Sequence, residues 1–202
     1  MPADFEKQSY WRERFASETS FEWLTSSESF MAILEPHLSS HSDTARPTRI
    51  LHLGSGTSDL QNHFRSRGYL DVTNVDYEPL AIERGQQREK AAFDNVRMKY
   101  VVADVTQLSY GLRQNREFDV VVDKSTVDAV SCGGETAFRR MVYQVRKCLA
   151  NDGLWISLSY SARRFDVEAL PFEVEVIAKI LTPKFKSSDP DVFHWCYLLR
   201  PK

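Results

Sequence analysis

A hydrophobic segment that runs directly into a glycine turn constrains this chain more than any other feature. The segment 50–53 (Ile-Leu-His-Leu) is followed by Gly54 and Gly56, and a helical pattern begins at Asp59. Glycine takes positive φ values and lets a ligand approach the backbone, and free N–H groups at a helix start attract polar or anionic groups. The segment therefore predicts a strand, a turn and a helix that suit a nucleotide-like ligand. Gly-x-Gly alone is a weak signal, so the prediction depends on the downstream sequence.

Size and composition favour one globular domain. The chain has 202 residues, 42% of them hydrophobic. This length is enough for one domain with a hydrophobic core and too short for two full domains. A net charge of −2 gives no electrostatic case for nucleic acid or an anionic membrane as partner. Charged residues interrupt any apolar run at the N-terminus and no stretch reaches membrane-spanning length, so we expect a cytoplasmic protein. We also expect a monomer. The three cysteines fit reduced thiols, and the five histidines form no metal-ligand pattern, so we expect no metal.

Short β-branched segments alternate with longer helical patterns, which is typical of strand–helix–strand units in a mostly parallel sheet. Asn151-Asp152-Gly153 predicts a turn before the fifth strand. The predicted strands are Arg49–Leu53, Asp71–Val75, Arg97–Val102, Phe118–Val122 and Leu154–Ser159. The predicted helices are Asp59–Arg67, Pro79–Ala92 and Glu135–Leu149.

The last third of the chain changes character. Glu173–Leu181 and Phe193–Leu199 are strand-like, and no helical pattern separates them. They predict an antiparallel pair added at the edge of the sheet. The predicted fold class is α/β, with a Rossmann-like, doubly wound, seven-stranded sheet that is mostly parallel and ends in an antiparallel strand pair.

Aspartates stand at three successive strand ends. Asp76 lies about twenty residues beyond the glycine turn, where a carboxylate can accept hydrogen bonds from both ribose hydroxyls. Asp104 can accept from an adenine amine, and Val105 offers the ring an apolar face. Asp123 and Lys124 place an acid and a base at the mouth of the same cleft. Each has an ordinary alternative, since an isolated Asp after a strand is often a cap and a Lys is often a solvated charge.

Further motifs make the pattern more specific, and together they extend over nearly the whole chain. They lie in the segments Tyr10–Phe15, Phe21–Leu24, Leu53–Ser58, Val75–Tyr77, Ala103–Val105, Phe118–Ala129 and Phe193–Tyr197. The Tyr-Trp, Phe-Glu-Trp and Asp-Lys-Ser-Thr-Val-Asp-Ala motifs among them are much more specific than the glycine turn. In these segments the chain resembles the class I, seven-β-strand S-adenosylmethionine-dependent methyltransferases, and within them the elongation factor 1-alpha lysine methyltransferases and their methyltransferase-like relatives.

The resemblance implies one methyltransferase domain over residues 1–202. It comprises an N-terminal helical lid (1–47), a cofactor-binding core (48–160) and a C-terminal strand pair (161–202). The cofactor would be S-adenosylmethionine, with S-adenosylhomocysteine as product. The implied cofactor-binding residues are Trp11, Phe15, Trp23, Gly54, Gly56, Asp76, Tyr77, Asp104, Val105 and Lys124.

The expected reaction is methyl transfer to a lysine amine of a protein such as elongation factor 1-alpha. Asp123 is the candidate catalytic residue, because its carboxylate could hold the acceptor amine. Ser125 stands where many relatives have glycine, which leaves the substrate open. The alternatives are a small-molecule methyltransferase of the same fold, an NAD-dependent oxidoreductase, and a non-catalytic module that binds S-adenosylmethionine.

Overall fold

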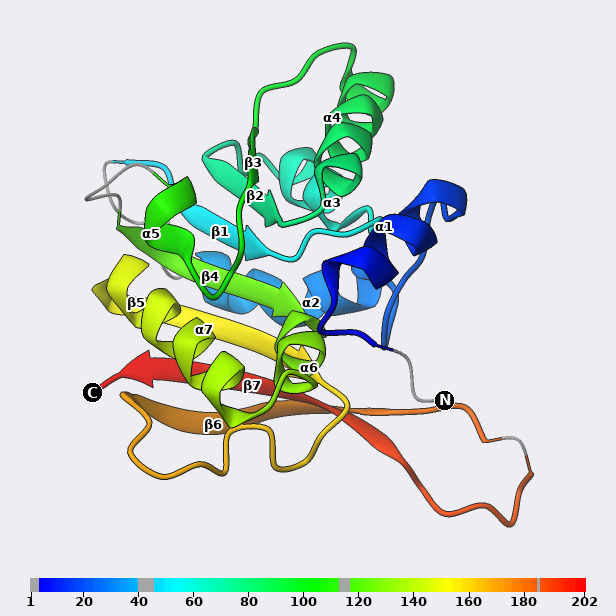
Figure 1. Cartoon of the computed structure of the whole chain (residues 1–202), viewed down its shortest axis with the longest axis vertical. Coiled ribbons are helices and arrows are strands. Elements are labelled where there is room, and N and C mark those ends of the chain that lie inside the picture. Colours follow the sequence, from blue (N-terminus) through cyan, green and yellow to red (C-terminus); the bar gives the residue numbers. More distant parts are fainter. Residues whose placement is uncertain (1–3, 40–45, 113–116, 185) are drawn as a thin grey trace.

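Seven strands form one sheet in the computed structural model, which describes residues 4–39, 46–112, 117–184 and 186–202 (Figure 1). The strands are β1 (Ile50–Leu53), β2 (Val72–Asp76), β3 (Lys99–Val102), β4 (Phe118–Lys124), β5 (Leu149–Ser159), β6 (Phe172–Leu181) and β7 (Phe193–Pro201). The helices are α1 (Gln8–Ser17), α2 (Ser27–Ser39), α3 (Leu60–Ser66), α4 (Pro79–Phe93), α5 (Leu108–Gly111), α6 (Thr126–Ser131) and α7 (Glu135–Cys148).

The strand order is β3-β2-β1-β4-β5-β7-β6. The first five strands are parallel to their neighbours, whereas β7 pairs antiparallel with both β5 and β6. All residues of β1, β2 and β4 are buried, as expected for central parallel strands covered on both faces. The predicted fold class, including the antiparallel pair at the C-terminus, is confirmed.

Two hydrophobic clusters lie on opposite faces of the sheet. On one face, α7 contributes Phe138, Met141, Val142 and Val145, at the spacing of one helical stripe. On the other face, α2 contributes Phe30, Met31, Leu34 and Leu38. Figure 1 shows α7 in front of the sheet and α2 behind it. α2 is thus part of the core, and of the described residues in the segment predicted as a lid, those before α2 are the ones placed to cover a ligand.

The chain reverses its direction of travel across the sheet at β1. From β1 it proceeds outward to β2 and β3, and then returns to place β4 on the other side of β1. Ligands of doubly wound sheets bind outside the carboxyl ends of the strands at such a switch point. Leu53 of β1 pairs with Val75 of β2 on one side and with Asp123 of β4 on the other. The glycine turn therefore begins level with the ends of both neighbours.

Several elements differ from the sequence predictions. Asn151-Asp152-Gly153 does not precede β5 but lies within it, where the register against β4 shifts between Phe118 and Val120. The predicted turn becomes an irregularity because residues on both sides of it pair with β4. Helices α1, α2, α5 and α6 were not predicted individually. Predicted strand ends elsewhere agree with the structure to within two residues.

An ionic cluster connects the start of β1 to the start of β4, at the amino ends of these strands and opposite the glycine turn. The Asp119 carboxylate accepts hydrogen bonds from the guanidinium of Arg46, from the guanidinium of Arg49 and from the Arg49 backbone N–H, with its shortest bonds at 2.8 Å. Burial raises the pKa of Asp119, but the bonds from the two arginines outweigh it and hold this pKa well below its usual range.

Replacing Asp119 with Asn should lower the free energy of unfolding by about 2 kcal/mol at pH 7, because charge-assisted hydrogen bonds are lost. A carboxylate with a depressed pKa stabilises the fold above its unfolded-state pKa, and this stabilisation disappears as the pH falls. Urea unfolding at pH 7 and pH 3 should therefore show a larger difference between wild type and Asp119→Asn at pH 7. An equal difference at both pH values would contradict the ionic role.

Candidate functional site

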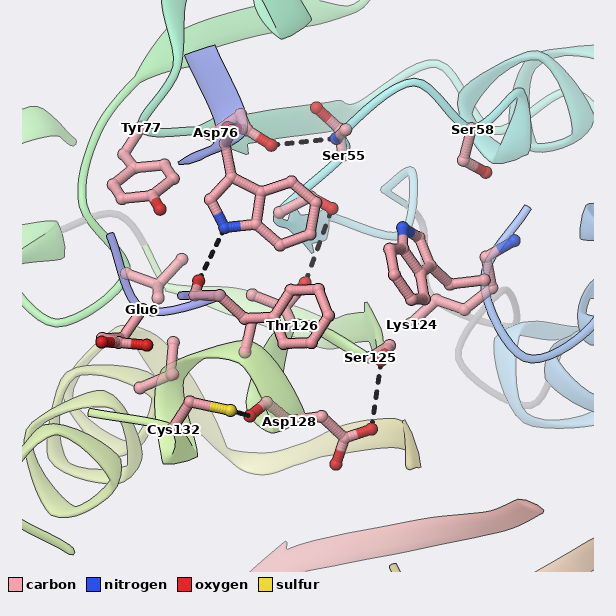
Figure 2. A pocket seen from close by; sticks show the side chains of 18 of the residues that line it. Glu6, Ser55, Ser58, Asp76, Tyr77, Lys124, Ser125, Thr126, Asp128 and Cys132 are labelled. Carbon is pink, nitrogen blue, oxygen red and sulfur yellow. Dashed lines mark hydrogen bonds between the residues drawn. The ribbon is translucent and has the colours of Figure 1, made fainter. Parts of the chain in front are cut away.

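A cavity of about 520 Å³ lies at the carboxyl ends of the central strands (Figure 2). Its walls come from the N-terminal segment, the glycine turn, the ends of β2, β3 and β4, and helix α6. The structure brings ten of the eleven predicted site residues together in these walls. They are Trp11, Phe15, Trp23, Gly54, Gly56, Asp76, Tyr77, Asp104, Val105 and Lys124.

The glycine turn has the backbone conformation that the sequence predicts. Gly54 and Gly56 have φ values of +61° and +51°. A Cβ atom on Gly54 would overlap the side chain of Thr126, the first residue of α6. The Thr126 hydroxyl donates to the carbonyl of Leu53 at 2.9 Å, so α6 packs directly on the turn. Gly54 is required for this close approach.

Asp76 ends β2 and joins the glycine turn to the start of α4. One carboxylate oxygen accepts the N–H of Gly56 and the other accepts the N–H of Glu78, each at 2.9 Å. Burial raises the pKa of Asp76 to about 6, although these two backbone bonds act in the opposite direction. The carboxylate is therefore fixed in orientation while it lines the cavity.

The β3 end contributes a second carboxylate and an apolar side chain. Asp104 accepts hydrogen bonds from the backbone N–H and the hydroxyl of Thr106, at 2.7 and 2.8 Å. Val105 is buried, and Tyr77 is half-buried in the same cavity. Figure 2 shows Tyr77 on one side of the cavity and Lys124 on the other. The cavity thus has an aromatic and apolar side and a side with a buried cation.

The N-terminal strap, defined here as residues 4–24, covers the cavity with aromatic rings. The Trp11 ring lies 5.4 Å from that of Phe15 and 6.0 Å from that of Trp23, measured between ring centroids. Gln8 donates to the backbone carbonyl of Tyr77 at 2.6 Å, which attaches α1 to the end of β2. Phe5, which the sequence analysis missed, lies within 6 Å of both Trp11 and Trp23. The rings both pack on one another and line the cavity.

Asp123 is the predicted site residue that the structure does not bring to the cavity. Its carboxylate is fully buried and accepts the Trp155 indole N–H at 2.8 Å and the Val127 backbone N–H at 3.1 Å. Burial raises the pKa of Asp123 to about 7. It does not line the cavity among the described residues, so its position agrees with the alternative of a cap for the segment after β4. Contact with an acceptor amine is not supported by this position.

The structure adds residues that sequence reasoning did not single out. Asp128 lines the cavity and binds Arg164 in an ion pair of 2.8 Å, and its second oxygen accepts from the Ser125 hydroxyl and the Tyr160 N–H. Ser55 also lines the cavity, and its buried hydroxyl has no hydrogen-bond partner among the described residues. Asp128 belongs to the specific Asp-Lys-Ser-Thr-Val-Asp-Ala motif, so membership of that motif could have indicated it as a site residue.

The described parts of the chain contain neither a metal-ligand cluster nor a membrane-spanning helix. No group of three or more His, Cys, Asp or Glu side chains there is arranged to hold a metal ion. No helix in the same residues has the length and apolar character needed to cross a bilayer.

Comparison with known families identifies the domain. Residues 50–153, just over half of the chain, match the model of a family described as a methyltransferase domain. The chain belongs to this methyltransferase family. It is a class I S-adenosylmethionine-dependent methyltransferase with the seven-stranded sheet of that class.

Curated relatives extend the likeness of this methyltransferase beyond the core. It is 54% identical over 200 residues to methyltransferase srdJ of Neurospora crassa, covering 98% of this chain and 85% of that protein. It is 29% identical over 171 residues to EEF1A lysine methyltransferase 4 of Mus musculus, covering 78% of this chain and 62% of that protein. It is 28% identical over 162 residues to the eEF1A lysine and N-terminal methyltransferase homolog of Drosophila melanogaster, covering 77% of this chain and 22% of that protein.

A solved structure shows the same fold. N-methyltransferase NodS from Bradyrhizobium japonicum WM9, in complex with S-adenosyl-L-homocysteine, superimposes with a TM-score of 0.70 at 16% identity. The superposition covers 98% of this chain and 99% of NodS. At this identity the likeness concerns the fold alone.

Asp76 allows a test of the electrostatics of the cavity. If ribose hydroxyls donate to its carboxylate, the ionised form is required, so affinity for S-adenosylhomocysteine should rise about tenfold from pH 5 to pH 7.5, through the raised pKa near 6. Asp76→Asn should weaken binding at pH 7.5 by about 1.5–3 kcal/mol and remove the rise through pH 6, so that any pH dependence left in the variant belongs to other groups such as Lys124. Calorimetry at both pH values measures this, and wild-type affinity in the variant would remove the ribose role.

Trp23→Ala tests whether the strap aromatics bind ligand or only pack. A binding role predicts that affinity for S-adenosylhomocysteine falls at least tenfold while the melting temperature changes little. Phe172→Leu, in the core of β6, is the matched control and should lower the melting temperature with no loss of affinity. Parallel losses of affinity and melting temperature in Trp23→Ala would support core packing instead.

Proposed function

We propose that this methyltransferase transfers a methyl group from S-adenosylmethionine to the amine of a protein lysine, with elongation factor 1-alpha as the first candidate substrate. The observation that supports the cofactor site is that ten residues from separate motifs line one cavity. Support for the acceptor comes from relatives whose names specify eEF1A lysine methylation and which match 77–78% of this chain. The cytoplasmic location, the monomeric state and the absence of a nucleic-acid partner stay predictions from composition.

In the proposed arrangement, the two sides of the cavity hold different parts of the cofactor. The Asp76 carboxylate would accept from the ribose, and the side with Tyr77, Asp104 and Val105 would hold the adenine ring. The Lys124 side would hold the charged amino-acid end. The backbone of the glycine turn fits this assignment, because it lines the cavity at Gly54, Ser55 and Gly56 and offers polar groups that a ligand can satisfy.

The chemistry requires alignment more than acid–base catalysis. S-adenosylmethionine supplies a methyl group that its sulfonium has already activated for transfer. The protein has to exclude water and hold the acceptor nitrogen in line with the S–CH₃ bond, and alignment of this kind supplies about 7–11 kcal/mol. The strap aromatics would exclude water. A lysine acceptor has to be neutral, so its pKa must fall from about 10.4 on entering the site.

The cavity lining includes groups that suit an amine-bearing chain. Glu6, Asp128, Ser125 and the exposed Tyr160 ring are among them. An aromatic ring and carboxylates attract an alkylammonium before it loses its proton. We infer that Asp128 acts mainly by positioning, since its oxygens are already bonded to Arg164, Ser125 and Tyr160.

The Neurospora crassa relative, at 54% identity, does not single out a lysine acceptor. Its name specifies a methyltransferase without an acceptor, while its sequence matches 98% of this chain. A small-molecule amine, hydroxyl or thiol is therefore the alternative acceptor. The cofactor would bind in the same way, and the lining groups named above would contact a different acceptor.

Radiolabelled methyl transfer distinguishes these acceptors. The enzyme is incubated with methyl-labelled S-adenosylmethionine and either purified elongation factor 1-alpha or a cell extract separated into protein and small-molecule fractions. We expect label in a protein band, with mass spectrometry locating the methyl group on lysine, and loss of label with Asp76→Ala. Label confined to the small-molecule fraction would contradict the lysine proposal and support the alternative acceptor.

A further inference from the structure

Glu22 in the strap bonds to three separate parts of the domain. One carboxylate oxygen accepts from the hydroxyls of Ser27 and Ser58 at 2.9 and 3.0 Å, and from the N–H of Asp59 at 3.1 Å. The other oxygen forms an ion pair with the ammonium of Lys124. One side chain thus joins the strap to the start of α2, to the segment before α3 and to the end of β4.

Lys124 is a charge that the fold buries at the edge of the cavity. Its side chain is 4% exposed, and it lines the cavity next to Ser125. Burial lowers the pKa of Lys124 to about 7, and the Glu22 carboxylate is the ion-pair partner of this ammonium. The carbonyl of Thr25 accepts a further hydrogen bond from the ammonium at 3.2 Å. A buried ammonium is costly unless it is paired, so its charge and position depend on the partner that the strap supplies.

The strap is also attached through Glu18 and Thr19, and among the described residues the hydrogen bonds and ion pairs of these two do not involve Lys124. Glu18 accepts from the Thr57 hydroxyl and binds Arg14 within the strap itself. Arg84 and Arg88, from α4, donate to the backbone carbonyls of Glu18 and Thr19. These contacts attach the strap to the domain, whereas Glu22 also fixes the cation that lines the cavity.

We propose that Glu22 is a positioning residue for the cofactor, which holds the Lys124 ammonium charged and directed at the end of the cavity that receives the cofactor's charged amino-acid end. The inference rests on the cofactor site proposed above. Closure of the strap is then linked to recognition of the cofactor's amino-acid end, because Glu22 of the strap is the counter-ion of Lys124, the residue that recognises this end. Figure 2 shows Lys124 and Tyr77 on opposite sides of the cavity, so an effect through Lys124 should not reach the adenosine side.

Calorimetry with two ligands tests this proposal. S-adenosylhomocysteine has the amino-acid end, and adenosine lacks it. Glu22→Gln should weaken S-adenosylhomocysteine binding about 10- to 100-fold and leave adenosine binding within about twofold. Lys124→Met should show the same selectivity, and the double variant should lose no more than the weaker-binding single variant. Glu18→Gln is the matched control, since it loosens the strap without contacting Lys124 and should affect both ligands equally.

Each outcome decides the proposal. Equal losses for both ligands in Glu22→Gln would show that Glu22 only attaches the strap, and unchanged binding of both would remove its role altogether; either result overturns the proposal. If wild type binds neither ligand, the cofactor site itself fails, and the inference fails with it. If Glu22→Gln does not fold, Glu22→Asp replaces it, because its shorter side chain draws the carboxylate away from Lys124. The selective loss is again expected, and an unchanged ratio of affinities overturns the proposal.

Discussion

The parallel pairing of β1 with both β2 and β4 is the constraint on which the rest of the structure depends. It brings the carboxyl ends of three buried strands to the same side of the sheet, where Gly54 lets the chain turn against Thr126. Backbone N–H groups and the carboxylate of Asp76 meet there, and Lys124 closes the opposite side of the cavity. No single motif forms the site, because each supplies one wall.

The strap completes this cavity with groups that a sheet alone cannot supply. Its aromatic rings would expose a large apolar surface if they were not packed over the cavity, so burial favours the closed arrangement. Its glutamates neutralise or bond groups that the turn and β4 present. The same contacts that stabilise the closed strap thus prepare the cavity for a ligand with both an apolar ring and a charged end.

The sequence predicted those parts that depend on local pattern. Buried parallel strands have continuous β-branched runs, and the glycine turn and the strand-end aspartates have fixed spacing, so their places were predictable. Helix α2 and the irregularity at Asn151–Gly153 depend on packing and register, which local turn preferences do not describe. The burial of Asp123 against Trp155 and the contact of Glu22 with Lys124 join residues 32 and 102 positions apart. Such long-range contacts leave no local signal.

The central claim is that the cofactor binds across the carboxyl ends of β1, β2 and β4, and a crystal structure grown with excess S-adenosylhomocysteine tests it most directly. The account predicts density for the ligand in the cavity beneath the strap, with its ribose hydroxyls within hydrogen-bond distance of Asp76 and its adenine beside Val105. A cavity filled by the protein's own side chains, or a ligand bound elsewhere on the molecule, would contradict the account.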